Sequence, residues 1–141
     1  MTVLLSAQEM RNLHKMEGLV NLPTSIVEAV KEFNHSEYRW RNDMDMLGTM
    51  LSYIEETKKV EKDVLEEVQS IIPLVDKNIR VLMHGHTDLM IKVIETLNGI
   101  GHRTEFINSH PEHELVSKYF EDIEQSEQLV LTLTNDFLEV V

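Results

Sequence analysis

The sequence predicts an α/β fold in which N-terminal helices precede a small, mostly parallel sheet with flanking helices. Residues 1–75 keep apolar side chains at helical spacing over long stretches. Residues 76–141 instead follow the order strand, helix, strand, helix, strand, which is typical of parallel units with right-handed crossovers. No linker or repeat separates the two parts, so 141 residues are expected to pack as one compact domain.

Two short helices are expected at the start of the chain. Ser6 and Glu9 form a capping box for the first, whose apolar positions end before Gly18. The second begins at residues 24–25, where either Thr or Ser can be the N-cap. The polar sequence Asn-His-Ser at residues 34–36 is expected to end it.

A long helical stretch is predicted over residues 37–72. Its apolar period shifts at residues 57–59, so the stretch is either one bent helix or two stacked helices. Pro73 disfavours a helical conformation in the residue before it, so the helix is expected to end there. The positions that carry the period are Trp40, Met44, Leu47, Leu51 and Ile54, followed by Val60, Val64, Val68 and Ile71.

Three strands are predicted in the second part, at residues 79–83, 104–107 and 129–134. The last alternates Leu or Val with Thr and has the clearest strand pattern of the chain. An alternative remains open for the first, because residues 79–97 also fit one continuous helix. Gly85 in its middle argues for the strand.

Two helices connect these strands. The first follows the break His84-Gly85-His86, is capped by Thr87 or Asp88, and ends at residues 98–101, where glycine permits a left-handed C-terminal residue. The second starts near Pro111, which suits the first helical position.

Composition limits the function classes. The chain carries 25 acidic and 13 basic residues, a formal charge of −12, and no basic stripe, so direct nucleic-acid binding is not expected. It has no cysteine, which excludes a disulfide scaffold, a thiolate zinc site and a cysteine nucleophile. No cofactor motif is present. The acidity serves either solubility or docking to a basic surface.

The location expected from the sequence is the cytoplasm, or the host cytoplasm if the protein is viral. Residues 1–10 lack the basic and apolar regions of a signal peptide. No stretch approaches eighteen uninterrupted apolar residues, so no membrane contact is expected.

Residues 84–88, His-Gly-His-Thr-Asp, are candidate metal ligands, because two imidazoles and a carboxylate stand close together after a predicted strand. The string resembles the HxHxDH signature of metallo-β-lactamase-like hydrolases, although Leu89 replaces the last histidine. The alternative is that His84 and His86 line a loop and Asp88 caps a helix.

A second candidate binding site comprises Tyr38, Arg39, Trp40 and Arg41, an aromatic and basic segment in an otherwise acidic chain. Aromatic residues and arginine are favoured in interface hot spots. The alternative is that arginine stems cover a buried tryptophan.

The second part also resembles a known family. Residues 79–87 are similar to the first strand and loop of the regulatory (alpha-type) subunits of translation initiation factor 2B and of related sugar-phosphate isomerases. Residues 105–112 resemble their second strand with its Ser-x-Pro segment, and residues 131–136 the third, which ends in Asp136. The resemblance implies a helical N-terminal region followed by a truncated, Rossmann-like unit.

The resemblance implies a non-catalytic relative, because the catalytic cysteine and the phosphate-binding loop of the isomerases are missing. Asp136 is the single family residue that carries over. The sequence therefore predicts a regulatory protein that acts by protein–protein contact, with initiation factor subunits as implied partners and self-association through an exposed edge. The alternatives are an acidic inhibitor of a basic or nucleic-acid-binding site and a metal-dependent hydrolase.

Overall fold

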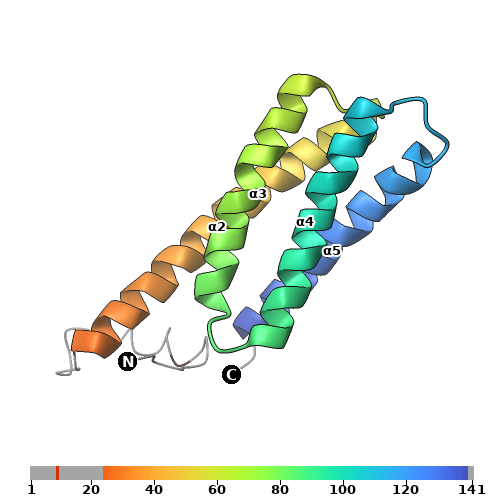
Figure 1. The fold of residues 1–141 in the computed structure, drawn as a ribbon. Helices are drawn as coiled ribbons and strands as arrows, with labels where there is room; N and C mark the ends of the chain where they lie inside the picture. Colours follow the sequence, from red (N-terminus) through yellow and green to blue (C-terminus); the bar gives the residue numbers. More distant parts are fainter. Residues whose placement is uncertain (1–8, 10–23, 140–141) are drawn as a thin grey trace.

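The computed structural model describes Glu9 and residues 24–139, and the described part of the chain contains four long helices and no strand (Figure 1). The helices are α2 (Thr24–Thr57), α3 (Lys62–Leu82), α4 (Thr87–Ser109) and α5 (Val116–Glu139). The first helix expected from the sequence, residues 6–18, lies outside the described residues except for Glu9. The same is true of the last two residues, 140–141.

The four helices run alternately up and down and form an antiparallel bundle (Figure 1). Each helix packs closely on its neighbour in the chain: α2 on α3, α3 on α4, and α4 on α5. On the fourth side of the bundle α2 lies next to α5, and these two helices contact each other much less extensively than the other neighbouring pairs do. The edge between α2 and α5 is therefore the most open side of the bundle.

The predicted α/β fold is wrong. All three predicted strands are helical: residues 79–82 are in α3, residues 104–107 in α4 and residues 129–134 in α5. The parallel sheet and the Rossmann-like unit are absent from the described residues, and the segments that carried the family resemblance are helices and helix-connecting turns.

The alternation of residues 129–134 was misleading because the same segment also has apolar residues at helical spacing. Val130, Thr134 and Leu138 are buried, while Leu129 is 38% exposed. The buried positions of α5 recur at intervals of three, four or seven residues, as expected for one face of a helix. Tertiary packing on α4 uses this face, so the helical period determines the structure.

The predicted break at residues 34–36 is absent, and α2 continues through it. The polar side chains are accommodated within the helix, since Asn34 Nδ2 donates to the Val30 carbonyl oxygen at 2.8 Å and Ser36 is buried. The shift in period at residues 57–59 coincides with a non-helical connection, so the stretch from residue 37 onward comprises two helices.

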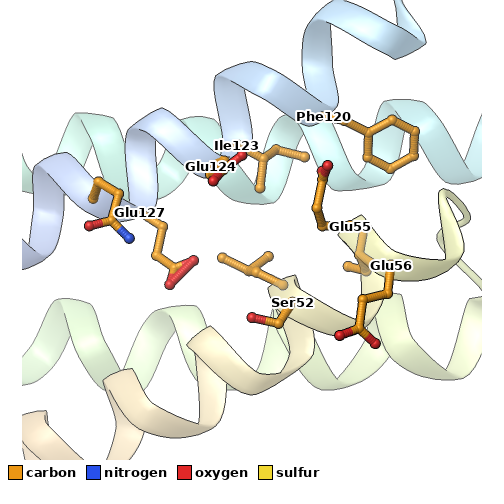
Figure 2. Close-up of a pocket in the computed structure, with 10 residues that line it drawn as sticks. Ser52, Glu55, Glu56, Phe120, Ile123, Glu124 and Glu127 are labelled. Carbon is orange, nitrogen blue, oxygen red and sulfur yellow. The ribbon is translucent and has the colours of Figure 1, made fainter.

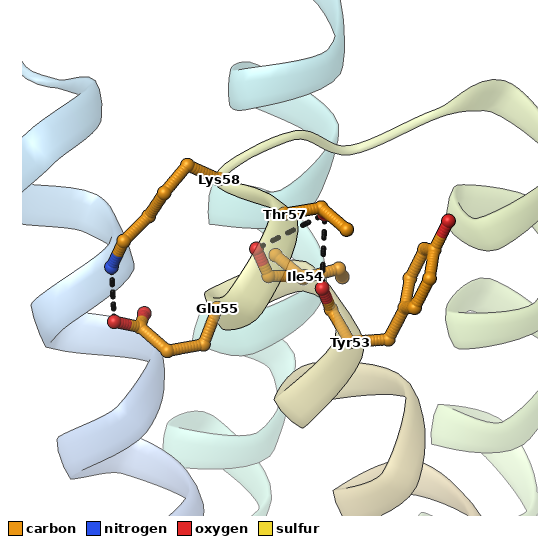
Figure 3. A network of polar contacts seen from close by, with 5 residues as sticks. All are labelled: Tyr53, Ile54, Glu55, Thr57 and Lys58. Carbon is orange, nitrogen blue, oxygen red and sulfur yellow. Dashed lines mark hydrogen bonds and ion pairs between the residues drawn. The ribbon is translucent and has the colours of Figure 1, made fainter.

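The end of α2 is stabilised by side chains that bond to its last turn (Figure 3). Thr57 Oγ1 donates to the Tyr53 carbonyl oxygen at 2.9 Å, and Lys58 forms an ion pair with Glu55. Lys58 adopts a positive φ of 53°, the left-handed conformation that ends many helices. Its backbone N–H donates to the Ile54 carbonyl oxygen at 2.8 Å.

Pro73 does not end a helix, contrary to the sequence prediction, but lies inside α3. The ring is exposed, whereas Ile71, Ile72 and Val75 on either side of it are buried in the core. Burial of this apolar face outweighs the lost backbone hydrogen bond. Asn78 adds a side-chain contact from α3 to α2, as its Nδ2 donates to Asp43 Oδ2 at 3.1 Å.

The break at residues 84–86 is as predicted, and Gly85 has a positive φ of 88°. The helix that follows starts at Thr87 with His86 as its N-cap, so neither predicted cap, Thr87 or Asp88, occupies that position. The predicted helix end at residues 98–101 is wrong, because α4 continues to Ser109. Gly101 has a packing role there: an added Cβ would lie 3.1 Å from Ile72 Cδ1 of α3. Pro111 lies in the α4–α5 turn rather than in a helix.

Candidate functional site: the groove between α2 and α5

A groove follows the open edge of the bundle, and its side chains come from α2 and α5 alone (Figure 2). Its narrower part has a volume of about 260 Å³. The side chains that line this part are Leu51, Ser52, Ile54, Glu55 and Glu56 of α2, and Phe120, Ile123, Glu124, Glu127 and Gln128 of α5. We call this feature, together with its extension below, the α2–α5 groove.

The α2–α5 groove extends along both helices into a wider, more open part of about 560 Å³. The two parts share Ser52, Glu56 and Glu127, so they form one continuous depression. The residues added by the wider part are Met44, Asp45, Gly48, Thr49 and Tyr53 of α2, and Leu131 of α5. Along α2 the groove covers residues 44–56, which corresponds to about 18 Å of helix.

Glu127 occupies a position of α5 where the packing pattern favours an apolar residue. Phe120 and Ile123 precede it and Val130 and Thr134 follow it, and all four are buried. This spacing of three and four residues defines the packing seam of a helix in a bundle. A carboxylate in such a seam costs stability unless a cation meets it.

The backbone of α2 makes room for this carboxylate at Gly48. An added Cβ at Gly48 would lie 3.2 Å from Glu127 Oε1, which is closer than an ordinary van der Waals contact. Figure 2 shows the Glu127 side chain directed from α5 toward α2, into the space between the helices. The small residues Gly48 and Ser52 on α2 thus leave the groove open beside Glu127.

The groove is strongly acidic. Asp45, Glu55, Glu56, Glu124 and Glu127 line it, and no lysine, arginine or histidine does so among the residues that the structure describes. Burial, and to a smaller extent the nearby Glu124 carboxylate, raises the pKa of Glu127 above its usual value. The groove therefore concentrates negative charge in a partly desolvated place.

One end of the groove is bounded by a cation that is already engaged. Lys58 pairs with Glu55, and its Nζ lies 5.3 Å from the centroid of the Phe120 ring. Within residues 24–139, no ion pair or hydrogen bond engages the side-chain carboxylates of Glu56, Glu124 and Glu127. These three carboxylates are available to an incoming cation.

The predicted segment of residues 38–41 does not form one site. Tyr38 is 68% exposed, whereas Trp40 is 1% exposed and belongs to the core. Arg41 lies with its guanidinium 5.7 Å from the Trp40 ring and bonds to Glu37 and, at 3.4 Å, to Asn135 of α5. Arg39 lines a separate depression between α2 and α3, which Leu74 also lines.

The predicted metal ligands are all exposed: His84 and His86 lie in the α3–α4 turn, and Asp88 lies in the first turn of α4. The described residues contain no group of three histidine, aspartate or glutamate side chains arranged to hold a metal ion. The His86 ring instead contacts the Phe137 ring edge-on, with centroids 5.0 Å apart. Asp136, the residue implied by the family resemblance, is next to Phe137 and is exposed.

The histidines of the α4–α5 turn surround an aromatic side chain. His110 stacks on Phe106 at 4.8 Å between centroids, and His113 and Tyr119 meet the same ring edge-on at 5.1 Å. The His113 Nδ1 atom accepts a hydrogen bond from the Leu115 N–H at 3.1 Å. These contacts secure the turn and account for the two histidines.

None of the residues that line the groove is among the site residues predicted from the sequence. A signal was present: Glu127 replaces an apolar residue in the series Phe120, Ile123, Val130 and Thr134. That series was not recognised because residues 129–134 were assigned to a strand. Even with the correct helix, the sequence does not show that α2 places Gly48 opposite Glu127.

Comparisons with known proteins do not identify a relative. No protein-family model matches the chain, and neither a curated protein nor a solved structure is significantly similar to it. Among the helices described above, none has an apolar stretch sufficient to cross a membrane.

Proposed function

We propose that this chain is a non-catalytic regulatory protein that acts by contact with another protein, and that the α2–α5 groove is its contact surface. The proposal depends chiefly on Glu127. Its carboxylate is partly buried in the packing seam, its pKa is raised, and it has no cationic partner among residues 24–139. An arrangement that costs stability in the free protein is explained if a partner supplies the missing charge.

The geometry of the bundle supports the same proposal. The other three helix pairs are closely packed, and the α2–α5 edge combines a depression with unpaired polar groups. Grooves between helices are a recurrent place for a partner segment to bind. The exposed Tyr53 beside the groove is of the residue type that interfaces favour.

Site-specific crosslinking tests this function. The chain has no cysteine, so Ser52→Cys places a single photoreactive label in the groove, and Ser70→Cys places the same label on the exposed face of α3 as the matched control. When each labelled protein is irradiated in a cell extract, we expect the groove label to form a discrete adduct with one protein and the control label to form none. Adducts would be identified by mass spectrometry.

Purified initiation factor subunits, the partners implied by the sequence resemblance, are a defined bait for the same two labels. Adducts of equal yield from both positions, or none from Ser52→Cys in any extract, would remove the groove as the contact surface. A failure with the initiation factor subunits alone would exclude that partner and leave the contact function in place.

A further inference from the structure

We infer that the occupant of the α2–α5 groove is a basic helical segment of another protein, with a lysine or arginine placed against Glu127. This inference depends on the proposed function and adds the chemistry of the partner. Three features of the groove support the inference: its shape, its charge and its unpaired carboxylates.

The shape of the groove fits a helix. The groove lies between two antiparallel helices that contact each other less extensively than the helix pairs adjacent in the chain do, and it runs parallel to them for about 18 Å. A helical segment of about twelve residues has this length. Such a segment would extend the bundle by lying along both α2 and α5.

The charge of the groove selects a cationic segment. Five carboxylates line it, and Glu56, Glu124 and Glu127 have no partner in the described part of the chain. A second copy of this chain would bring a further formal charge of −12. Electrostatic complementarity therefore favours a basic partner over self-association through this surface.

Glu127 gives the site its specificity. Because the carboxylate is partly buried and the space beside Gly48 is open, an ammonium or guanidinium group can approach it from the groove. In a partly desolvated site a charge-assisted hydrogen bond is stronger than on an exposed surface. The exposed Tyr53 and the partly buried Leu131 line the same part of the groove and offer apolar contact to the partner helix.

The test uses a labelled synthetic peptide of about fourteen residues, with lysine and arginine on one helical face and leucine on the other. Its binding to the full chain would be measured by fluorescence anisotropy at low salt and at about 0.15 M salt. An acidic peptide of the same pattern and a scrambled basic peptide are the ligand controls. We expect binding of the amphipathic basic peptide that survives the higher salt, and weaker binding of both controls.

Matched variants locate the interaction. The double variant Glu124→Gln with Glu127→Gln should weaken binding about tenfold or more. The double variant Glu66→Gln with Glu95→Gln changes the net charge equally on the exposed faces of α3 and α4, and should leave binding nearly unchanged. Circular dichroism would confirm that both variants keep their helical content.

Three outcomes would overturn the inference. Equal weakening by both double variants would show that only the overall field of the protein attracts the peptide. Tight binding of the scrambled peptide would show that a basic helix is not the ligand. If the groove label crosslinks a partner while no basic peptide binds, the proposed function stands and the inferred partner chemistry is wrong.

Discussion

The Glu127 carboxylate of α5 faces Gly48 of α2 across the open edge of the bundle, so close that a Cβ at Gly48 would lie 3.2 Å from Oε1. The partly buried Glu127 carboxylate lowers the stability of the free protein and is at the same time accessible from the groove. It leads to two predictions at the groove, and the core and α3 each provide one more.

Glu127→Gln should stabilise the protein at neutral pH. The raised pKa of Glu127 means that the folded state binds a proton more readily than the unfolded chain, so stability is lost as the pH rises from the usual glutamate pKa through the raised value. Glutamine does not ionise, so the variant does not lose stability in this way as the pH rises. The gain should stay below about 1 kcal/mol, because the side chain is only half-buried and solvent screens it.

Thermal melting of Glu127→Gln and the parent protein at neutral pH, and again below the usual glutamate pKa, would check this. The difference in Tm should shrink in acid, where Glu127 is protonated in both states. Glu66→Gln, on the exposed surface of α3, should show neither effect. A Glu127→Gln variant that is less stable at neutral pH would indicate a favourable ion pair.

Gly48→Ala should raise stability while weakening binding of the basic peptide. Alanine favours the helix by up to about 1 kcal/mol, and the atom it meets is the end of the flexible Glu127 side chain, which can move. The displaced carboxylate no longer occupies the open space beside α2. Urea denaturation and peptide titration together measure the two effects.

Gly99→Ala on α4 is the control for Gly48→Ala, since its added Cβ also meets only the end of a flexible side chain, that of Arg103. It should stabilise the helix without changing peptide affinity. An affinity for Gly48→Ala equal to that of the parent protein would argue against a role for this part of the groove.

Thr134→Val should stabilise the core. The Thr134 hydroxyl and the Trp40 indole N–H are buried and have no hydrogen-bond partner within the described part of the chain. Valine keeps the shape and removes an unsatisfied polar atom, which is worth about 1 kcal/mol, or about 3 °C in Tm. Thr132→Val, the same change at an exposed position of α5, should have little effect. A fall in Tm would reveal a buried water bound to Thr134.

Pro73→Ala should stabilise α3 by about 2 kcal/mol. Pro73 lies in the helix interior and has no N–H to donate to the Gln69 carbonyl, and its exposed ring contributes no core packing. Denaturation followed by circular dichroism would measure the gain, with Ser70→Ala as a smaller helix-propensity control. An unchanged or lower stability would show that Pro73 does not destabilise α3.

Much of the local structure follows from the order of the residues alone. The apolar period of residues 40–54 predicted the buried face of α2, and the shift at residues 57–59 marks the break after it. The break at residues 84–86 was also predicted correctly, whereas the N-cap of the next helix is His86 rather than Thr87 or Asp88. These features depend on neighbouring residues, whose spacing and turn chemistry are visible in a single chain.

Packing between the helices is what makes residues 79–82, 104–107 and 129–134 helical rather than extended. Short apolar runs fit either period, and the choice depends on which face finds a partner. Packing of α3, α4 and α5 against one another buries the helical face, as Val130 and Thr134 show, and this burial also keeps Pro73 within α3. The site depends on packing for the same reason: Gly48 and Glu127 are far apart in the chain, and their approach follows from how α2 and α5 meet.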